Sequence, residues 1–162
     1  MSESAAGTAE PASGRIVVGL DGSPSSEEAL RWALRQAALT GWSVEAVTAW
    51  ELPPYFGYAP GSEIDFRGEA AEVLEASVRA VVGAEGDVPV SRLVLRGHPA
   101  RVLLDASDGA GLLVVGSRGR GGFAGMLLGS VSQHVIAQAT CPVVVLHDRG
   151  GPAGGAQPGG TR

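Results

Sequence analysis

Five short runs rich in apolar residues alternate with four longer segments, and this alternation limits the folds open to the chain. The runs are Ile16–Leu20, Val44–Trp50, Val90–Leu95, Leu112–Val115 and Val143–Leu146. Short apolar runs are typical of strands buried on both faces of a parallel sheet. Helices between such strands form right-handed crossovers. The chain is therefore predicted to adopt a doubly wound α/β fold, Rossmann-like, around a five-stranded parallel sheet.

The segments between the runs carry helix signals. Ser23 can cap the first helix with Pro24 in its first turn, and Gly41 is expected to end it. Apolar residues recur along this helix every three or four positions across residues 30–38. The four helices are expected over residues 24–40, 70–82, 99–107 and 130–138. Gly83 is expected to end the second of them.

The expected strand order, 3-2-1-4-5, places the ends of the first and fourth strands side by side. In such sheets, ligands bind beyond the carboxyl ends of the strands, where the strand order switches direction. Asp21 follows the first strand and Gly116 follows the fourth. The sequence therefore predicts one crevice in which these two residues meet.

The folded part is expected to be a single domain over residues 15–148. A chain of 162 residues is long enough to build one hydrophobic core. Residues 1–14 and 149–162 are rich in small residues, glycine and proline, so they could not bury enough apolar surface to offset the entropy of ordering them. They are predicted to be disordered tails.

A glycine motif follows the fourth apolar run. Gly116 and Gly119 are separated by two residues, and Gly129-Ser130 follows nine residues later at the start of the last expected helix. Glycines let a backbone approach a ligand closely, and exposed N–H groups at a helix start favour an anion. The two parts of the motif together predict a site for the phosphates of a nucleotide.

Composition excludes several other kinds of site. Lysine is absent, so a phosphate loop of the G-x4-G-K-[ST] type and covalent catalysis through lysine are excluded. The formal net charge of −5, with no basic cluster, argues against nucleic acid as a partner. Cys141 is the only cysteine, so the chain has no intrachain disulfide and no cysteine-based zinc site. No metal-ligand spacing and no Ser-His-Asp arrangement is visible, so no catalytic residue is assigned.

The pattern of hydropathy bears on location. Residues 1–14 lack the apolar core of a secretory signal. No apolar run approaches the ~20 residues that a membrane span needs. The expectation is a cytoplasmic protein without a membrane partner.

Five separated motifs are spread along the expected domain, namely Val17–Ser23, Gly97–Ala100, Val115–Gly119, Leu128–Ser132 and Cys141–Val145. They resemble motifs of the universal stress protein family. The spacing G-x2-G-x9-G-[ST] is similar to that of the subgroup that binds ATP. The resemblance covers nearly the whole of the expected domain.

The resemblance implies an ATP site with two sides. On the adenosine side, Gly19, Leu20 and Asp21 would line the nucleotide, with Asp21 reaching the adenine or the ribose. Ala49 would face the adenine through its backbone. On the phosphate side, backbone N–H groups would be joined by hydroxyl groups and by the charge of Arg118. The residues concerned there are Val115, Gly116, Arg118, Gly119, Gly129, Ser130, Val131 and Ser132.

The resemblance also implies a role and an assembly. The protein would act as a nucleotide-dependent stress-response or signalling switch with an unknown protein partner and no or only slow ATP hydrolysis. Mg²⁺ would enter only as a companion of ATP. Val143–Leu146 is expected to be an edge strand that pairs across a two-fold axis, giving a homodimer.

Two alternatives remain open from the residues. Gly119–Ala124 also matches the G-x-G-x-x-A pattern of dinucleotide-binding oxidoreductases. Against this alternative, the helix pattern begins near Ser130 rather than at the glycines, and the βαβ unit stands at the end of the domain. The other alternative is a nucleotide-free dimeric interaction module, although the glycine motif here is complete.

Overall fold

The computed structural model of the protein describes residues 14–54, 64–85, 88–121 and 125–149. The predicted sheet is confirmed: five parallel strands lie in the order β3-β2-β1-β4-β5. The strands are β1 (Arg15–Gly19), β2 (Ser43–Trp50), β3 (Val90–Arg96), β4 (Leu112–Gly116) and β5 (Val143–Leu146). The helices are α1 (Pro24–Thr40), α2 (Phe66–Glu85), α3 (Pro99–Ala106) and α4 (Ser130–Gln138). The predicted tails lie almost entirely outside the described residues.

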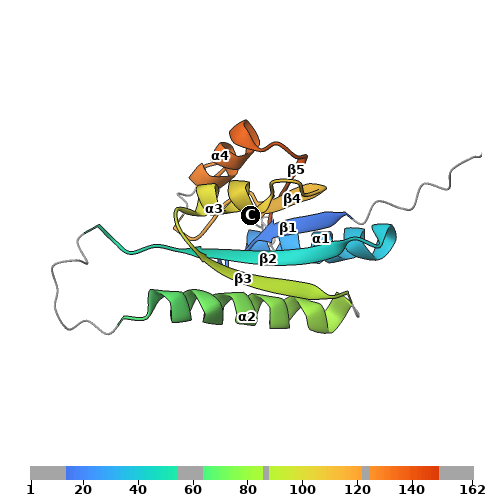
Figure 1. Ribbon diagram of the computed structural model, residues 1–162, viewed down its shortest axis with the longest axis horizontal. Coiled ribbons are helices and arrows are strands. Elements are labelled where there is room, and N and C mark those ends of the chain that lie inside the picture. The colour runs from blue at the N-terminus through green and yellow to red at the C-terminus, as the bar shows by residue number, and fades with distance from the viewer. Residues whose placement is uncertain (1–13, 55–63, 86–87, 122–124, 150–162) are drawn as a thin grey trace, which may run out of the picture.

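The sheet separates two helical layers. α1 and α2 contact each other and cover one face, and α3 and α4 cover the other face, as Figure 1 shows. All strands run in the same direction, so their carboxyl ends lie at one edge of the sheet. The loops that follow β1, β2 and β4 therefore meet at that edge.

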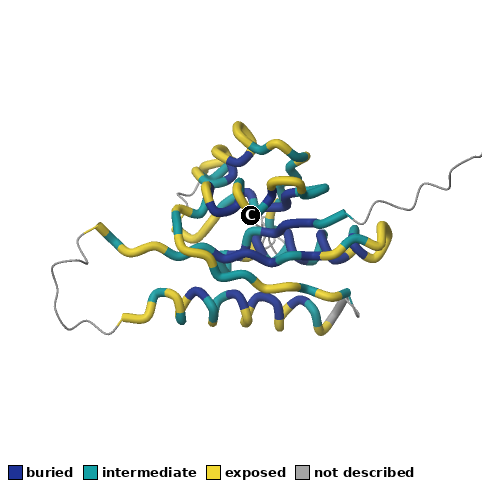
Figure 2. Tube along the Cα trace, in the orientation of Figure 1, coloured by how far each residue is buried: buried dark blue, intermediate teal, exposed yellow. Residues whose placement is uncertain are grey.

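Alternating residues of the strands build two cores, one on each face. Ile16 and Val18 of β1 pack with α1 and α2, while Val17 packs with α3 and α4. All three side chains are fully buried. The buried positions follow the inner strands in Figure 2. Burial on both faces explains why the first and fourth strands are apolar without interruption.

The boundaries of α1 agree with the sequence signals. The Ser23 side chain accepts a hydrogen bond from the Ser26 N–H, and Pro24 is in the first turn. Gly41 adopts a left-handed conformation with φ of 73°, and its N–H donates to the Ala37 carbonyl. The signals at both ends of this helix are local, so they are legible in the sequence.

The predicted boundaries of α2 are wrong at both ends. The helix begins at Phe66 and continues through Gly83 to Glu85. An exposed glycine within a helix costs about 1 kcal/mol relative to alanine, which does not end a helix that is held elsewhere. Leu74, Val78 and Val81 are buried against the sheet and hold this one. Tertiary packing therefore overrides the local glycine signal.

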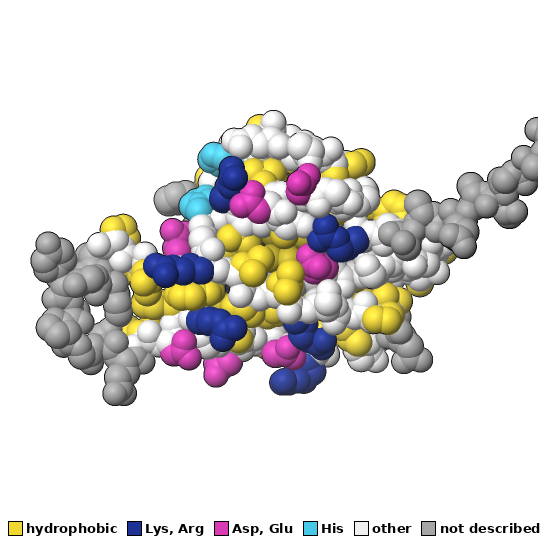
Figure 3. All heavy atoms as spheres, in the orientation of Figure 1, with side chains coloured by type: hydrophobic (Ala, Val, Ile, Leu, Met, Phe, Trp, Pro, Cys, Tyr) yellow, Lys and Arg dark blue, Asp and Glu magenta, His cyan; other side chains and the backbone are white. Residues whose placement is uncertain are grey.

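The half of the sheet that contains β3 is less completely covered on the side of α3 and α4. There Leu93 is half-buried, and Leu95 is 36% exposed. In the space-filling view, hydrophobic side chains are exposed in the middle of this face, bordered by arginine and acidic side chains (Figure 3). α2 covers β3 on the opposite face.

Candidate functional site

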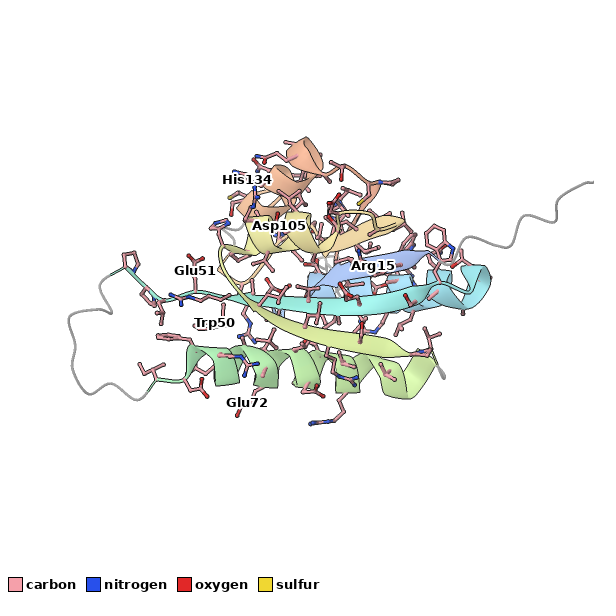
Figure 4. All side chains as sticks on the ribbon, viewed as in Figure 1. Arg15, Trp50, Glu51, Glu72, Asp105 and His134 are labelled. Carbon is pink, nitrogen blue, oxygen red and sulfur yellow. The ribbon has the colours of Figure 1, made fainter. Side chains whose placement is uncertain are left out.

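A cavity of about 690 Å³ opens at the carboxyl ends of β1, β2 and β4. This volume lies in the range of sites for small molecules and cofactors. The lining includes every residue predicted to bind a nucleotide, namely Gly19, Leu20, Asp21, Ala49, Val115, Gly116, Arg118, Gly119, Gly129, Ser130, Val131 and Ser132. Trp50 and Glu51 line it as well, at the carboxyl end of β2 (Figure 4). The fold thus brings the whole predicted set together, as the strand order requires.

The β1 wall is built by main-chain bonds. The Leu20 N–H donates to the Val47 carbonyl at 2.9 Å, and the Thr48 hydroxyl donates to the Leu20 carbonyl at 2.9 Å. A Cβ on Gly19 would lie 2.8 Å from the Leu103 side chain. Glycine at position 19 therefore lets α3 pack closely on β1.

Asp21 joins two loops at the mouth of the cavity. Its Oδ1 accepts from the Ser23 N–H at 2.9 Å, and its Oδ2 accepts from the Arg120 N–H at 3.1 Å. The first bond shapes the turn into α1, and the second holds the glycine loop, which is residues 117–121 after β4. A carboxylate can accept further hydrogen bonds, so Asp21 can hold the loops and still meet a ligand.

The packing of the chain itself requires a glycine at position 116, and Gly119 lies close to the Asp21 side chain. A Cβ on Gly116 would lie 2.7 Å from the carbonyl carbon of Ser25, so only glycine lets β4 end this close to α1. A Cβ on Gly119 would lie 2.7 Å from Asp21 Oδ2. These two glycines therefore allow close packing within the protein, whatever else the cavity holds.

Gly129, at the start of α4, is different. Its φ of −73° and ψ of 167° suit any residue, and a Cβ there would approach no atom closer than 3.5 Å. As the N-cap of α4 it provides no side-chain hydrogen bond. The first N–H groups of a helix have no acceptor within the helix, so this end of α4 can bind an anion.

The two serines of α4 differ in availability. The Ser132 hydroxyl is buried and lies 2.7 Å from the Gly116 carbonyl oxygen, to which it donates. Ser130 is exposed at the cavity. Only the Ser130 hydroxyl is therefore free to meet a ligand without breaking that bond to the end of β4.

The charged residues in the lining are Asp21, Glu51, Glu69, Arg118 and Arg120. Arg118 Nη2 lies 3.7 Å from Asp148 Oδ1, beyond the end of β5. The Arg120 side chain instead extends past Gly22 toward α2. The two arginines of the glycine loop therefore point to different neighbours.

The N-terminal half of α2 forms a wall that the sequence analysis missed. Phe66, Glu69, Ala70 and Val73 line the cavity there. The predicted start at Ala70 left Phe66 in a loop. Phe66, Ala70 and Val73 follow one another at i, i+4 and i+7, so helical periodicity extended by one turn could have found this wall.

The described residues include no group that stands out for metal or membrane chemistry. Within the ranges that the structure covers, no cluster of three or more His, Cys, Asp or Glu side chains is arranged to hold a metal ion. None of the described helices is long and apolar enough to cross a membrane. His98 caps α3 by accepting from the Ala100 N–H at 3.3 Å, and its ring centroid lies 6.4 Å from that of His134.

Comparison with known sequences identifies one family. A sequence model of the universal stress protein family matches residues 13–147. Universal stress proteins of Mycobacterium tuberculosis (Rv2005c) and Mycobacterium bovis (Mb2028c) are each 41% identical to this chain over 145 residues. The match covers 84% of this chain and 46% of each relative. The chain therefore spans about half the length of these relatives.

Solved structures with the same fold include proteins bound to nucleotides. A universal stress protein in complex with cAMP is 28% identical, with a TM-score of 0.62, over 83% of this chain and 97% of that one. A universal stress protein from Archaeoglobus fulgidus in complex with dAMP is 26% identical, with a TM-score of 0.57, over 82% and 96%. The hypothetical protein MJ0577, at 20% identity and a TM-score of 0.70 over 86% and 99%, supports the fold alone.

Proposed function

The chain belongs to the universal stress protein family, and on this basis we propose that it binds ATP in the cavity at the carboxyl ends of β1 and β4. The adenosine would lie against the ends of β1 and β2, and the phosphates against the glycine loop and the start of α4. The protein would act as a nucleotide-dependent switch in a stress response or in signalling, with no or only slow hydrolysis.

The observation that carries the proposal is Gly129. A serine or aspartate would cap α4 better than glycine does, and neither the φ of Gly129 nor its surroundings require a glycine. A side chain at this position would compete for the helix N–H groups and fill the space beside them. Glycine leaves both open to the cavity, which is what a phosphate group needs.

The structures of relatives support an adenine nucleotide as the ligand. The universal stress proteins solved in complex with cAMP and with dAMP share this fold over more than four-fifths of the chain. The preference for ATP rests on the glycine motif and the resemblance that it carries. We expect Mg²⁺ to enter with ATP, held by the phosphate oxygens.

A switch needs two states that the nucleotide distinguishes. A ligand shifts a conformational equilibrium only by the difference between its affinities for the two states. The glycine loop is a suitable element because Asp21 ties it to the end of β1. We also propose that the protein works in the cytoplasm through a protein partner.

We further propose a homodimer formed through β5. This strand lies at the edge of the sheet, and all four of its residues are half-buried. An apolar edge strand has unpaired backbone groups on its free side, and a second copy across a two-fold axis would satisfy them.

The experiment is thermal unfolding of the whole chain with ATP, ADP, GTP, cAMP, NAD or no nucleotide. A ligand at ~100 times its Kd stabilises the folded state by about 2.7 kcal/mol, and each kcal/mol is worth roughly 2–4 °C in Tm for a chain of this size. Gly129→Ala is the test variant because its added methyl group has room in the unliganded protein. Gly83→Ala is the matched control, since position 83 is exposed in α2 with no atom within 4 Å of a new Cβ.

We expect ATP to raise the Tm of the wild type and of Gly83→Ala but not of Gly129→Ala. If cAMP alone raises the Tm, the ligand is a cyclic nucleotide rather than ATP. A response to NAD alone would favour the oxidoreductase alternative. If no nucleotide changes the Tm of the wild type, the proposal fails and the interaction module takes its place. Phosphate release, measured separately, tests for hydrolysis.

A further inference from the structure

We propose that Arg120, rather than Arg118, supplies the side-chain charge that neutralises the phosphates in the cavity. The inference rests on the proposed function, because it assigns a residue to the phosphate part of the same site. It changes the expectation from sequence, which gave this role to Arg118.

Arg118 already has a charged neighbour on another side of the glycine loop. Its Nη2 lies 3.7 Å from Asp148 Oδ1. Its main chain is held as well, because the Ser25 hydroxyl donates to the Arg118 carbonyl at 2.6 Å. With Ser25 and Asp148, Arg118 lines a separate hollow of about 160 Å³ between α1 and the end of β5. Its guanidinium would have to leave Asp148 in order to serve a ligand.

Arg120 is anchored at its backbone, and its side chain has no ion pair with any residue that the structure describes. Its N–H donates to Asp21 Oδ2 at 3.1 Å, which fixes the start of the side chain at the mouth of the cavity. Its Nη2 lies 2.8 Å from the point where a Cβ on Gly22 would be, and Cγ1 of Val73 lies 3.1 Å from that point. The guanidinium therefore passes between the loop after β1 and the cavity wall formed by α2.

No acidic side chain neutralises this guanidinium within the part of the chain that the structure describes. The ion pairs of the described residues include Arg118 with Asp148 but none of Arg120. The side chain is exposed, so water solvates it in the free protein. It can turn toward an anion without first breaking an ion pair.

The charge of the cavity explains why such a cation is needed. Besides the two arginines, the charged groups of the lining are the carboxylates of Asp21, Glu51 and Glu69. Arg118 is already paired with Asp148. A triphosphate carries several negative charges, which these carboxylates repel. The N–H groups of α4 supply only a partial charge. A guanidinium offers a full charge and two parallel hydrogen bonds to phosphate oxygens.

The test is calorimetric titration of the whole chain with ATP and with adenosine at low and high salt. The variants are Arg120→Gln and Arg118→Gln, and Arg101→Gln is the control because Arg101 lies exposed on α3 beside Asp105. A hydrogen bond to a charged group is strong enough that its loss weakens ATP binding about 10-fold or more. We expect that loss with Arg120→Gln, a smaller one with Arg118→Gln, and unchanged adenosine affinity in both. The ATP affinity of Arg120→Gln should also depend less on salt.

The outcomes separate this inference from the function on which it rests. If the wild type binds neither ligand, the proposed function fails first, and the role of Arg120 fails with it. If the wild type binds ATP but Arg118→Gln loses more affinity than Arg120→Gln, Arg118 is the phosphate ligand and the inference is overturned. If Arg120→Gln weakens ATP and adenosine equally, the side chain contacts the nucleoside or shapes the cavity, which also overturns it.

Discussion

The carboxylate of Asp21 accepts a hydrogen bond from the Arg120 N–H at 3.1 Å and so joins two residues that are 99 positions apart in the sequence. Its other oxygen accepts from the Ser23 N–H at 2.9 Å. One side chain therefore fixes both the turn into α1 and the glycine loop. At the mouth of the cavity, a single residue after β1 thus connects the two loops.

Asp21→Ala should loosen the glycine loop in the protein without ligand. The Arg120 N–H loses its acceptor, so its amide hydrogen should exchange with solvent faster. The loss of both hydrogen bonds should lower the free energy of unfolding by about 1–3 kcal/mol. Hydrogen exchange followed by mass spectrometry on peptides that span residues 118–121 measures the first effect. Asp105→Ala, at an exposed position of α3, is the control. Unchanged protection in Asp21→Ala would show that the bond does not hold the glycine loop.

Gly116→Ala should destabilise the fold even without a nucleotide. The new Cβ would lie 2.7 Å from both the carbonyl carbon of Ser25 and the nitrogen of Ser26, so β4 or α1 must shift. Overpacking of this kind costs about 1–3 kcal/mol. Gly83→Ala should have the opposite sign and raise stability by up to ~1 kcal/mol, since alanine is the better helix former. Chemical denaturation of both variants measures the difference; a stable Gly116→Ala would mean that glycine is there for a ligand.

Ser117 and Ser132 should respond differently to replacement by alanine. The Ser132 hydroxyl is buried and donates to the Gly116 carbonyl at 2.7 Å, so Ser132→Ala should cost about 0.5–1.5 kcal/mol. The Ser117 hydroxyl is buried without a hydrogen-bond partner among the described residues. Ser117→Ala should therefore leave stability unchanged or raise it. Parallel urea denaturation curves test the pair, and equal losses would contradict the assignment.

Val144→Lys should lower the mass of the protein in solution from dimer toward monomer. A charged side chain on the edge strand β5 disfavours pairing with a second copy. Size exclusion with light scattering measures the mass, and circular dichroism checks that the variant is folded. Ser91→Lys, exposed on the opposite edge strand β3, is the matched control. A folded Val144→Lys that keeps the mass of the wild type would remove β5 from the interface.

The order of the elements and the place of the cavity were predictable from the sequence. Apolar runs buried on both faces stand out as strands, and Ser23 and Gly41 mark the ends of α1 through local hydrogen bonds and backbone angles. Strand order then brings Asp21 and Gly116 to one edge of the sheet, because parallel strands place their carboxyl ends together. All of the predicted site residues consequently line one cavity.

Other features depend on contacts between distant segments, which no local pattern records. α2 runs through Gly83 because buried side chains hold it to the sheet. The direction of each arginine depends on whether a partner such as Asp148 lies within reach. The sequence by itself thus determined the strands, the helix caps and the glycine spacing, since these depend on neighbouring residues. Only the tertiary structure decided which glycines serve internal packing, which wall α2 provides and which guanidinium has no ion pair among the described residues, because those depend on distances across the fold.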